Sequence, residues 1–99
     1  MPIIYHVTTK SDWDKAKQQG AYDSLSLANE GFIHCSQDHQ VAGVLERYFE
    51  GQINLVKLVI DTDKLSSKFV FDWSPSMADT FPHVYGPINL DAVVGIVAI

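Results

Sequence analysis

The chain has 99 residues, of which 46% are hydrophobic and 19% charged, a composition that fits one globular domain and excludes two domains or a disordered chain. No apolar run approaches the roughly 18–20 residues that a membrane-spanning helix needs, so no integral membrane protein is expected. The formal charge is −5, Arg47 is the only arginine, and the six lysines are scattered among acidic neighbours, which argues against binding of duplex DNA.

In chain order, the first half predicts a strand, a helix, a turn-rich connector and a second strand, over residues 3–8, 12–19, 22–30 and 32–36. Ser11 is the expected N-cap of the helix, and Gly20 the expected residue that ends it. The connector has room for one helical turn at residues 25–28.

The second half opens with the clearest helical pattern, an apolar stripe at residues 41, 44, 45, 48 and 49, with Asp38 as its expected N-cap and Gly51 as its stop. Strands are predicted at residues 55–61, 68–73 and 92–99, and a polar loop at residues 74–80. The last strand is almost wholly apolar and is therefore expected to be central or sandwiched. The fold class is α+β, a compact single domain with a mostly antiparallel or mixed curved sheet and two main helices.

Three of the four histidines share a local setting with an aromatic residue within two positions; they are His6, His34 and His83. Because residues two apart on a strand face the same way, His6 shares a face with Thr8, and His34 shares one with Phe32 and Ser36. If these strands are neighbours, they form a polar row between aromatic rings, which suits a ring-containing ligand. The alternative is buried histidines satisfied by backbone groups.

The segment FPHVYGP at residues 81–87 has a backbone fixed by two prolines and a glycine, with His83 and Tyr85 on one face if it is extended. This pattern favours a preorganised site, and a proline-rich turn that only closes one end of the sheet is the alternative. Asp72 lies between two aromatic residues, so it is expected either to be an acid with a raised pKa that serves as a general base, or an ordinary exposed strand residue.

The sequence lacks the common motifs of serine hydrolases, of dinucleotide and phosphate binding, and of zinc binding. The chain has no G-x-S-x-G, no G-x-G-x-x-G, no phosphate loop and no closely spaced metal-binding histidines. A zinc site would have to be assembled by the fold from the three histidines, and a metallohydrolase of that kind is one open alternative. Cys35 alternates with His34 along the strand, so it is expected in the core, and His39 is expected at the surface. A single cysteine and an N-terminus without a signal-peptide pattern predict a cytoplasmic protein.

The segments GFIHCS at residues 31–36 and FPHVYGP at 81–87, with Ile-Tyr-His near the start, Trp13 and Ser-Leu-Ala at 26–28, resemble the domain-of-unknown-function family 952. The resemblance covers nearly the whole chain. It implies a small, mainly bacterial protein without an established activity, with a fold similar to that of ADP-ribosyltransferases.

A second resemblance, of His6 with Thr8, Gly20 and the strand carrying His34, is to the opening half of the RNA 2′-phosphotransferase family. By that analogy His6 contacts a ribose hydroxyl of NAD, His34 or Ser36 lines the nicotinamide end, and Tyr22 or Phe32 stacks on a ring. The chain departs from these families in having one arginine and in carrying Asp72 where a glutamate is common.

The resemblances and the residues together predict a cleft for NAD, ADP-ribose or a related nucleotide, with NAD as a possible substrate and ADP-ribosyl transfer as a possible reaction. A non-catalytic binding module on the same fold is the alternative, and a structural role, as a monomer or a weak homodimer through a sheet edge, is a third. Asp72 would stabilise positive charge at the ribose, and His83 with Tyr85 would close the pocket. The predicted catalytic residues are Asp72 and His83, and the predicted ligand-binding residues are His6, Thr8, Tyr22, Phe32, His34, Ser36 and Tyr85.

Overall fold

The computed structural model describes residues 2–99. Its strands are β1 (Ile3–Thr9), β2 (Ala21–Tyr22), β3 (Ile33–His34), β4 (Leu55–Asp61), β5 (Phe69–Ser74), β6 (Asp79–Val84), β7 (Ile88–Asn89) and β8 (Val93–Ala98). Its helices are α1 (Lys10–Gln19), α2 (Leu25–Glu30) and α3 (Val41–Tyr48), with short 3₁₀ helices η1 (Asp38–Gln40), η2 (Thr62–Lys64) and η3 (Leu90–Ala92). Within residues 2–99, no helix has the length and apolarity that a bilayer span requires.

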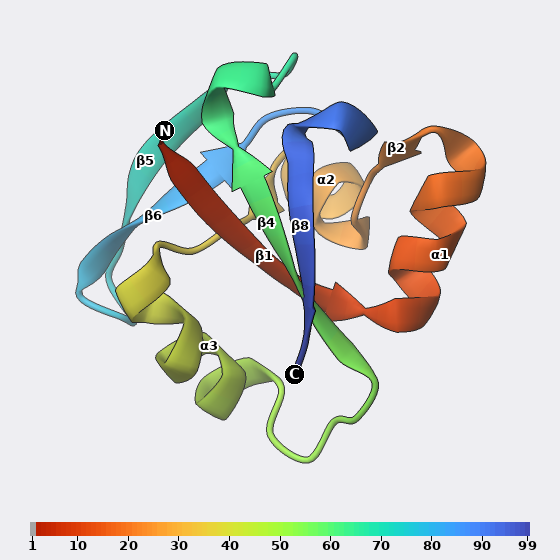
Figure 1. Cartoon of the computed structure of the whole chain (residues 1–99). Helices are drawn as coiled ribbons and strands as arrows, with labels where there is room; N and C mark the ends of the chain where they lie inside the picture. The colour runs from red at the N-terminus through yellow and green to blue at the C-terminus, as the bar shows by residue number, and fades with distance from the viewer. Residues whose placement is uncertain (1) are drawn as a thin grey trace.

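The strands form three antiparallel sheets, with the orders β1-β4-β8, β2-β7 and β3-β6-β5 (Figure 1). A bridge between Tyr5 and Ser36 connects the first sheet to the chain that follows β3. The predicted α+β class with antiparallel pairing is therefore confirmed, although the strands divide among three small sheets where one was expected. The bridge brings the segment after β3 beside Tyr5 and His6 in the middle of β1, which is the region of the site.

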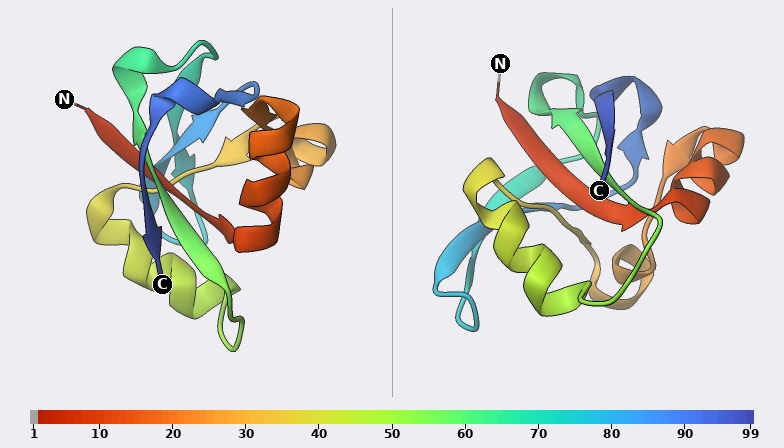
Figure 2. Two further views of the ribbon diagram at one scale, coloured as in Figure 1. Left: turned by 45° about the vertical axis from the view of Figure 1, so that its right-hand side comes forward. Right: turned by 60° about the horizontal axis from the view of Figure 1, so that its bottom comes forward.

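Helices α1 and α3 lie on opposite sides of β1 and β4 (Figures 1 and 2). Strand alternation explains this arrangement, because one face of β1 carries Ile4 into the main core and the other carries Val7 against α3. The main core also holds Trp13 from α1 and the fully buried Leu58 from β4. Complete burial of a leucine or isoleucine side chain stabilises the fold by about 1.5–3 kcal/mol.

The ends of the first helix follow local chemistry. Thr9, and not the predicted Ser11, caps α1, because the Thr9 hydroxyl accepts a hydrogen bond from the backbone N–H of Asp12 at 3.1 Å. Gly20 ends the helix as predicted, with a left-handed φ of 90° that costs glycine little. The helix starts two residues earlier than expected, directly after β1, so Asp12 lies in its first turn.

Several predictions for the second half were wrong. Asp38 lies inside η1, which Gln37 caps, and α3 ends at Tyr48 with Phe49 as its C-cap, before Gly51. Strand β8 is an edge strand paired only with β4, and its Val94 and Ile96 side chains are 45% and 48% exposed. An apolar run predicts a strand but does not show how many neighbours it has. The predicted loop at residues 74–80 is shorter, because β5 extends to Ser74 and β6 already begins at Asp79.

Candidate functional site

The three histidines that share a sequence setting meet at one cleft. His6 on β1, His34 on β3 and His83 on β6 all line a cavity of about 780 Å³. The pairing explains the convergence, since His34 and His83 are direct register partners in the β3-β6 ladder. The volume lies within the roughly 300–1,000 Å³ typical of small-molecule sites.

His6 is the centre of a buried hydrogen-bond network. Its Nδ1 lies 2.5 Å from the backbone carbonyl of His34, and its Nε2 lies 2.7 Å from the Tyr22 hydroxyl, which is 3.1 Å from Thr8 Oγ1. Burial lowers the pKa of His6 to about 4, so the ring is neutral at pH 7. The one proton of the His6 ring is donated from Nδ1 to the carbonyl, and the Tyr22 hydroxyl contacts Nε2 of His6 and donates to Thr8 Oγ1.

This network fixes the chemistry of Tyr22. Burial raises the pKa of Tyr22 to about 12, so its hydroxyl keeps its proton at neutral pH. His6 and Thr8 share one face of β1, as predicted, and all three residues line the cleft. Both nitrogens of His6 are already bonded within the protein, so a ligand hydroxyl meets the oxygens of Tyr22 and Thr8 before it can reach the imidazole.

His83 is held in a different way. Its Nδ1 donates to the carboxylate of Asp72 at 2.8 Å, and the Tyr85 hydroxyl donates to the same carboxylate oxygen. The Nε2 of His83 has no hydrogen-bond partner among residues 2–99, and His83 lines the cleft. The carboxylate therefore orients the imidazole through Nδ1, and Nε2 is left for a ligand.

Asp72 differs from its prediction in electrostatics and in position. The hydrogen bond from Tyr85, with a further one from His83, holds the pKa of Asp72 below its usual range, so the expected raised pKa is wrong. Neither Asp72 nor Tyr85 is among the lining residues of the cleft. Asp72 is connected to the cleft by its hydrogen bond to His83, and its predicted part in catalysis stays a prediction.

Phe32 holds the two other imidazoles in place. Its ring stacks on His83, with centroids 4.1 Å apart and planes inclined by 13°, and meets the edge of His34 at 4.8 Å. His34 Nε2 also lies 2.8 Å from a carboxylate oxygen of Glu30. Phe32 does not line the cleft, so its predicted stacking on a ligand has no support in this arrangement, whereas Ser36 is a buried lining residue.

Cys35 is buried in the core, as predicted, and burial raises the pKa of its thiol well above the usual range. His39 is exposed, as expected, and lies 3.2 Å from Asp79. Within the described part of the chain, no group of three histidine, cysteine or acidic side chains is placed to hold a metal ion. Because His6 uses both ring nitrogens internally, the three-histidine metal site has no geometric support.

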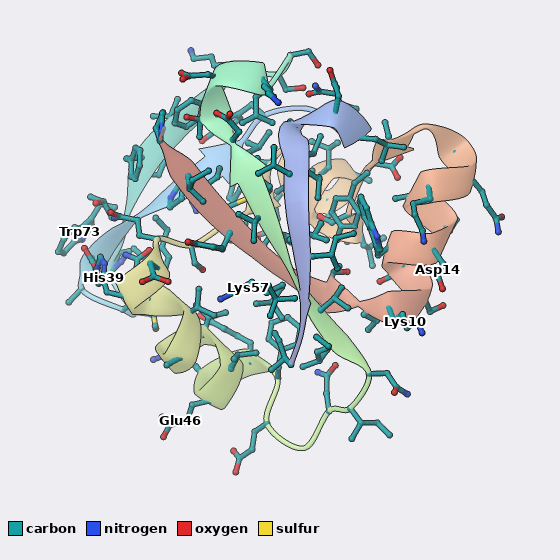
Figure 3. All side chains as sticks on the ribbon, viewed as in Figure 1. Lys10, Asp14, His39, Glu46, Lys57 and Trp73 are labelled. Atoms are coloured by element: carbon teal, nitrogen blue, oxygen red, sulfur yellow. The ribbon has the colours of Figure 1, made fainter. Side chains whose placement is uncertain are left out.

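The sequence reasoning missed the residues at the mouth of the cleft. Trp73 at the end of β5, Tyr48 at the end of α3 and Leu25 at the start of α2 are exposed apolar side chains that line it. Figure 3 shows Trp73 at the outer edge of the molecule, near the end of β5. A signal was present in the alternation of β5, which places Trp73 and Phe71 on its solvent side.

Comparison with known proteins agrees with the sequence motifs. The model of the family described as "Protein of unknown function (DUF952)" matches residues 7–96. No curated protein matches the chain.

The crystal structure of protein CC0527 from Caulobacter crescentus is similar, with 31% identity and a TM-score of 0.87 over 96% of this chain and 83% of that chain. The solution structure of CC0527 gives 31% identity and a TM-score of 0.84, over 100% and 85% of the two chains. The motifs, the family match and the shared fold show that this chain belongs to the DUF952 family.

Proposed function

We propose that the cleft binds a small ring-containing molecule of the nucleotide class, with NAD and ADP-ribose as the first candidates. The convergence of three histidines on one cavity of about 780 Å³ supports this proposal. The resemblance to ADP-ribosyltransferases noted from the sequence points to the same ligands. A shared fold does not by itself assign a ligand, so the proposal depends on the residues that line the cleft.

The hydroxyl groups on the cleft wall suit the ribose of such a ligand. Tyr22 and Thr8 present oxygens that are held in one hydrogen-bond network with His6, and Ser36 adds a third hydroxyl to the lining. Groups that are fixed before binding lose little conformational entropy when a ligand arrives. His6 contributes by holding Tyr22 in place, and His34 adds an exposed ring edge near Glu30.

A second candidate function, transfer of the ADP-ribosyl group, is favoured by the free Nε2 of His83. A hydroxyl of an acceptor attacks C1′ of the nicotinamide ribose, and its proton passes to Nε2. The C1′–N bond breaks, and its electron pair neutralises the pyridinium ring of nicotinamide, which leaves. Asp72 holds Nδ1 and stabilises the imidazolium that forms.

The test is an amide-resolved NMR titration of the ¹⁵N-labelled protein with NAD, ADP-ribose and nicotinamide in separate samples, with product spectra recorded alongside. Saturable shifts around His6, His34 and His83 would support binding, and release of nicotinamide from NAD would support transfer. Binding without release would leave a non-catalytic module. An absence of shifts with all three compounds would refute the proposed function.

A variant pair separates the two candidates. In His83→Asn, the amide can still donate to Asp72 in the manner of Nδ1, but no group replaces the free Nε2. We expect this variant to bind NAD and to lose the transfer reaction. His39→Asn removes an exposed histidine in the same way and is the matched control, with binding and turnover unchanged.

A further inference from the structure

We infer that the cleft holds the heterocycle and ribose of its ligand, prefers a neutral or positively charged ring, and leaves any phosphate group outside its lining. The inference rests on the proposed function and narrows it. None of the lysines or the arginine is among the lining residues, whereas the carboxylates of Asp12 and Glu30 are. Phosphate groups are bound chiefly by arginine, lysine or backbone N–H groups. A lining with two carboxylates and no basic side chain therefore disfavours a phosphate group.

Two acidic side chains line the cleft. Asp12, in the first turn of α1, is exposed and forms no ion pair with the described residues. Glu30 lies 2.8 Å from Nε2 of His34. Two carboxylates with no lysine or arginine beside them in the lining favour a cation over an anion, and added salt screens this preference.

Two basic side chains, Lys57 of β4 and Arg47 of α3, make contacts outside the lining of the cleft. Lys57 lies over the ring of Tyr5, 4.9 Å from its centre, on the face of β1 opposite His6. Arg47 donates to the carbonyl of Ser76 at 3.4 Å, and its guanidinium carbon is 5.8 Å from the centre of the Tyr48 ring. Neither cation lines the cleft.

The mouth of the cleft suits a flat ring. Trp73 is 62% exposed there, and Tyr48 and Leu25 present further apolar surface beside it. Aromatic faces carry partial negative charge, so they attract cationic rings and stack on neutral heterocycles. Apolar rings at the mouth, together with two acidic side chains in the lining, suit a pyridinium or a neutral nucleoside.

Nicotinamide riboside and nicotinamide mononucleotide test the inference, because they share a cationic ring and a ribose and differ by one phosphate. Binding is measured by calorimetry at low salt and by quenching of tryptophan fluorescence. We expect the riboside to bind about three- to tenfold more tightly, with the difference shrinking as salt is added. Asp12→Asn should reduce the difference, and Trp73→Leu should weaken both compounds about two- to tenfold and remove the quenching.

The outcomes are distinguishable. Tighter binding of the mononucleotide, or binding of NAD and ADP-ribose without binding of the riboside, would overturn the inference and leave the proposed function in place. A preference for the riboside that is the same in Asp12→Asn would also overturn it, because the selectivity would then come from another source. If none of the four compounds binds, both the inference and the proposed function fall.

Discussion

Acid should destabilise this protein well above the pH at which carboxylates titrate, and His6 is the reason. The pKa of His6 is about 4 in the folded protein, against the usual 6.5 expected in the unfolded chain, because burial disfavours the charged ring. The unfolded state therefore takes up the proton first. The stabilising contribution is complete above pH 6.5 and is lost progressively as the pH falls toward 4.

The size of the effect follows from these two pKa values. Lowering the pH from 7.5 to 5 should reduce the free energy of unfolding by about 2 kcal/mol through His6 alone. Domains of this size have a total of roughly 5–15 kcal/mol, so the loss is a large fraction. Asp72 and Asp79 have pKa values lowered by their hydrogen bonds, so their contributions are lost at more acidic pH and do not enter this window.

Urea unfolding at several pH values between 5 and 7.5 measures the slope. In His6→Asn, the amide can still donate to the carbonyl of His34, so the variant is less stable at neutral pH but has lost the part of the slope that His6 supplies. His39→Asn is the control and should keep the slope. A wild-type slope near zero, or one that His6→Asn retains in full, would refute the reasoning, and NMR titration of the His6 ring checks the pKa directly if that variant does not fold.

Three further predictions concern the same region. Tyr22→Phe removes the hydroxyl that contacts a buried nitrogen of His6, so we expect a loss of about 1–3 kcal/mol in the free energy of unfolding, measured in urea; an unchanged value would contradict the network. Asp72→Asn should shift the ring proton of His83 away from Nδ1, which ring ¹⁵N shifts report, and unaltered shifts would mean that the carboxylate does not set the tautomer. Cys35 should resist iodoacetamide in the folded protein and react after unfolding, and alkylation of the native protein would contradict its burial.

Local patterns in the sequence were sufficient for most of the elements. The run at residues 55–61 predicted β4 with the bounds that the structure has, because near-continuous apolar residues suit a strand covered on both faces. Gly20 ended α1 as predicted, since the left-handed conformation there favours glycine. These features depend on residues close together in the chain, which is what periodicity and capping report.

Pairing between distant segments could not be predicted in the same way. The sequence indicated that His6, His34 and His83 share a setting, but only the β3-β6 ladder and the bridge at Tyr5 bring them to one cleft. The same applies to the edge position of β8, which depends on which strands remain to cover it. The lowered pKa of Asp72 likewise requires donors that lie 11 and 13 residues away in sequence.

His6 and His83 have different roles in the cleft. Variants of the two residues must therefore be interpreted differently. A general base needs an accessible lone pair, which His83 has at Nε2 and His6 does not, because the Tyr22 hydroxyl occupies it. Replacing His6 frees a buried tyrosine and threonine, so a loss of ligand binding in that variant would follow from the disordered wall as readily as from a lost contact. Replacing His83 by asparagine keeps a donor to Asp72 and removes Nε2, together with the ring that stacks on Phe32. A loss of turnover with NAD binding retained in His83→Asn would therefore point to the missing base, which a His6 variant could not show.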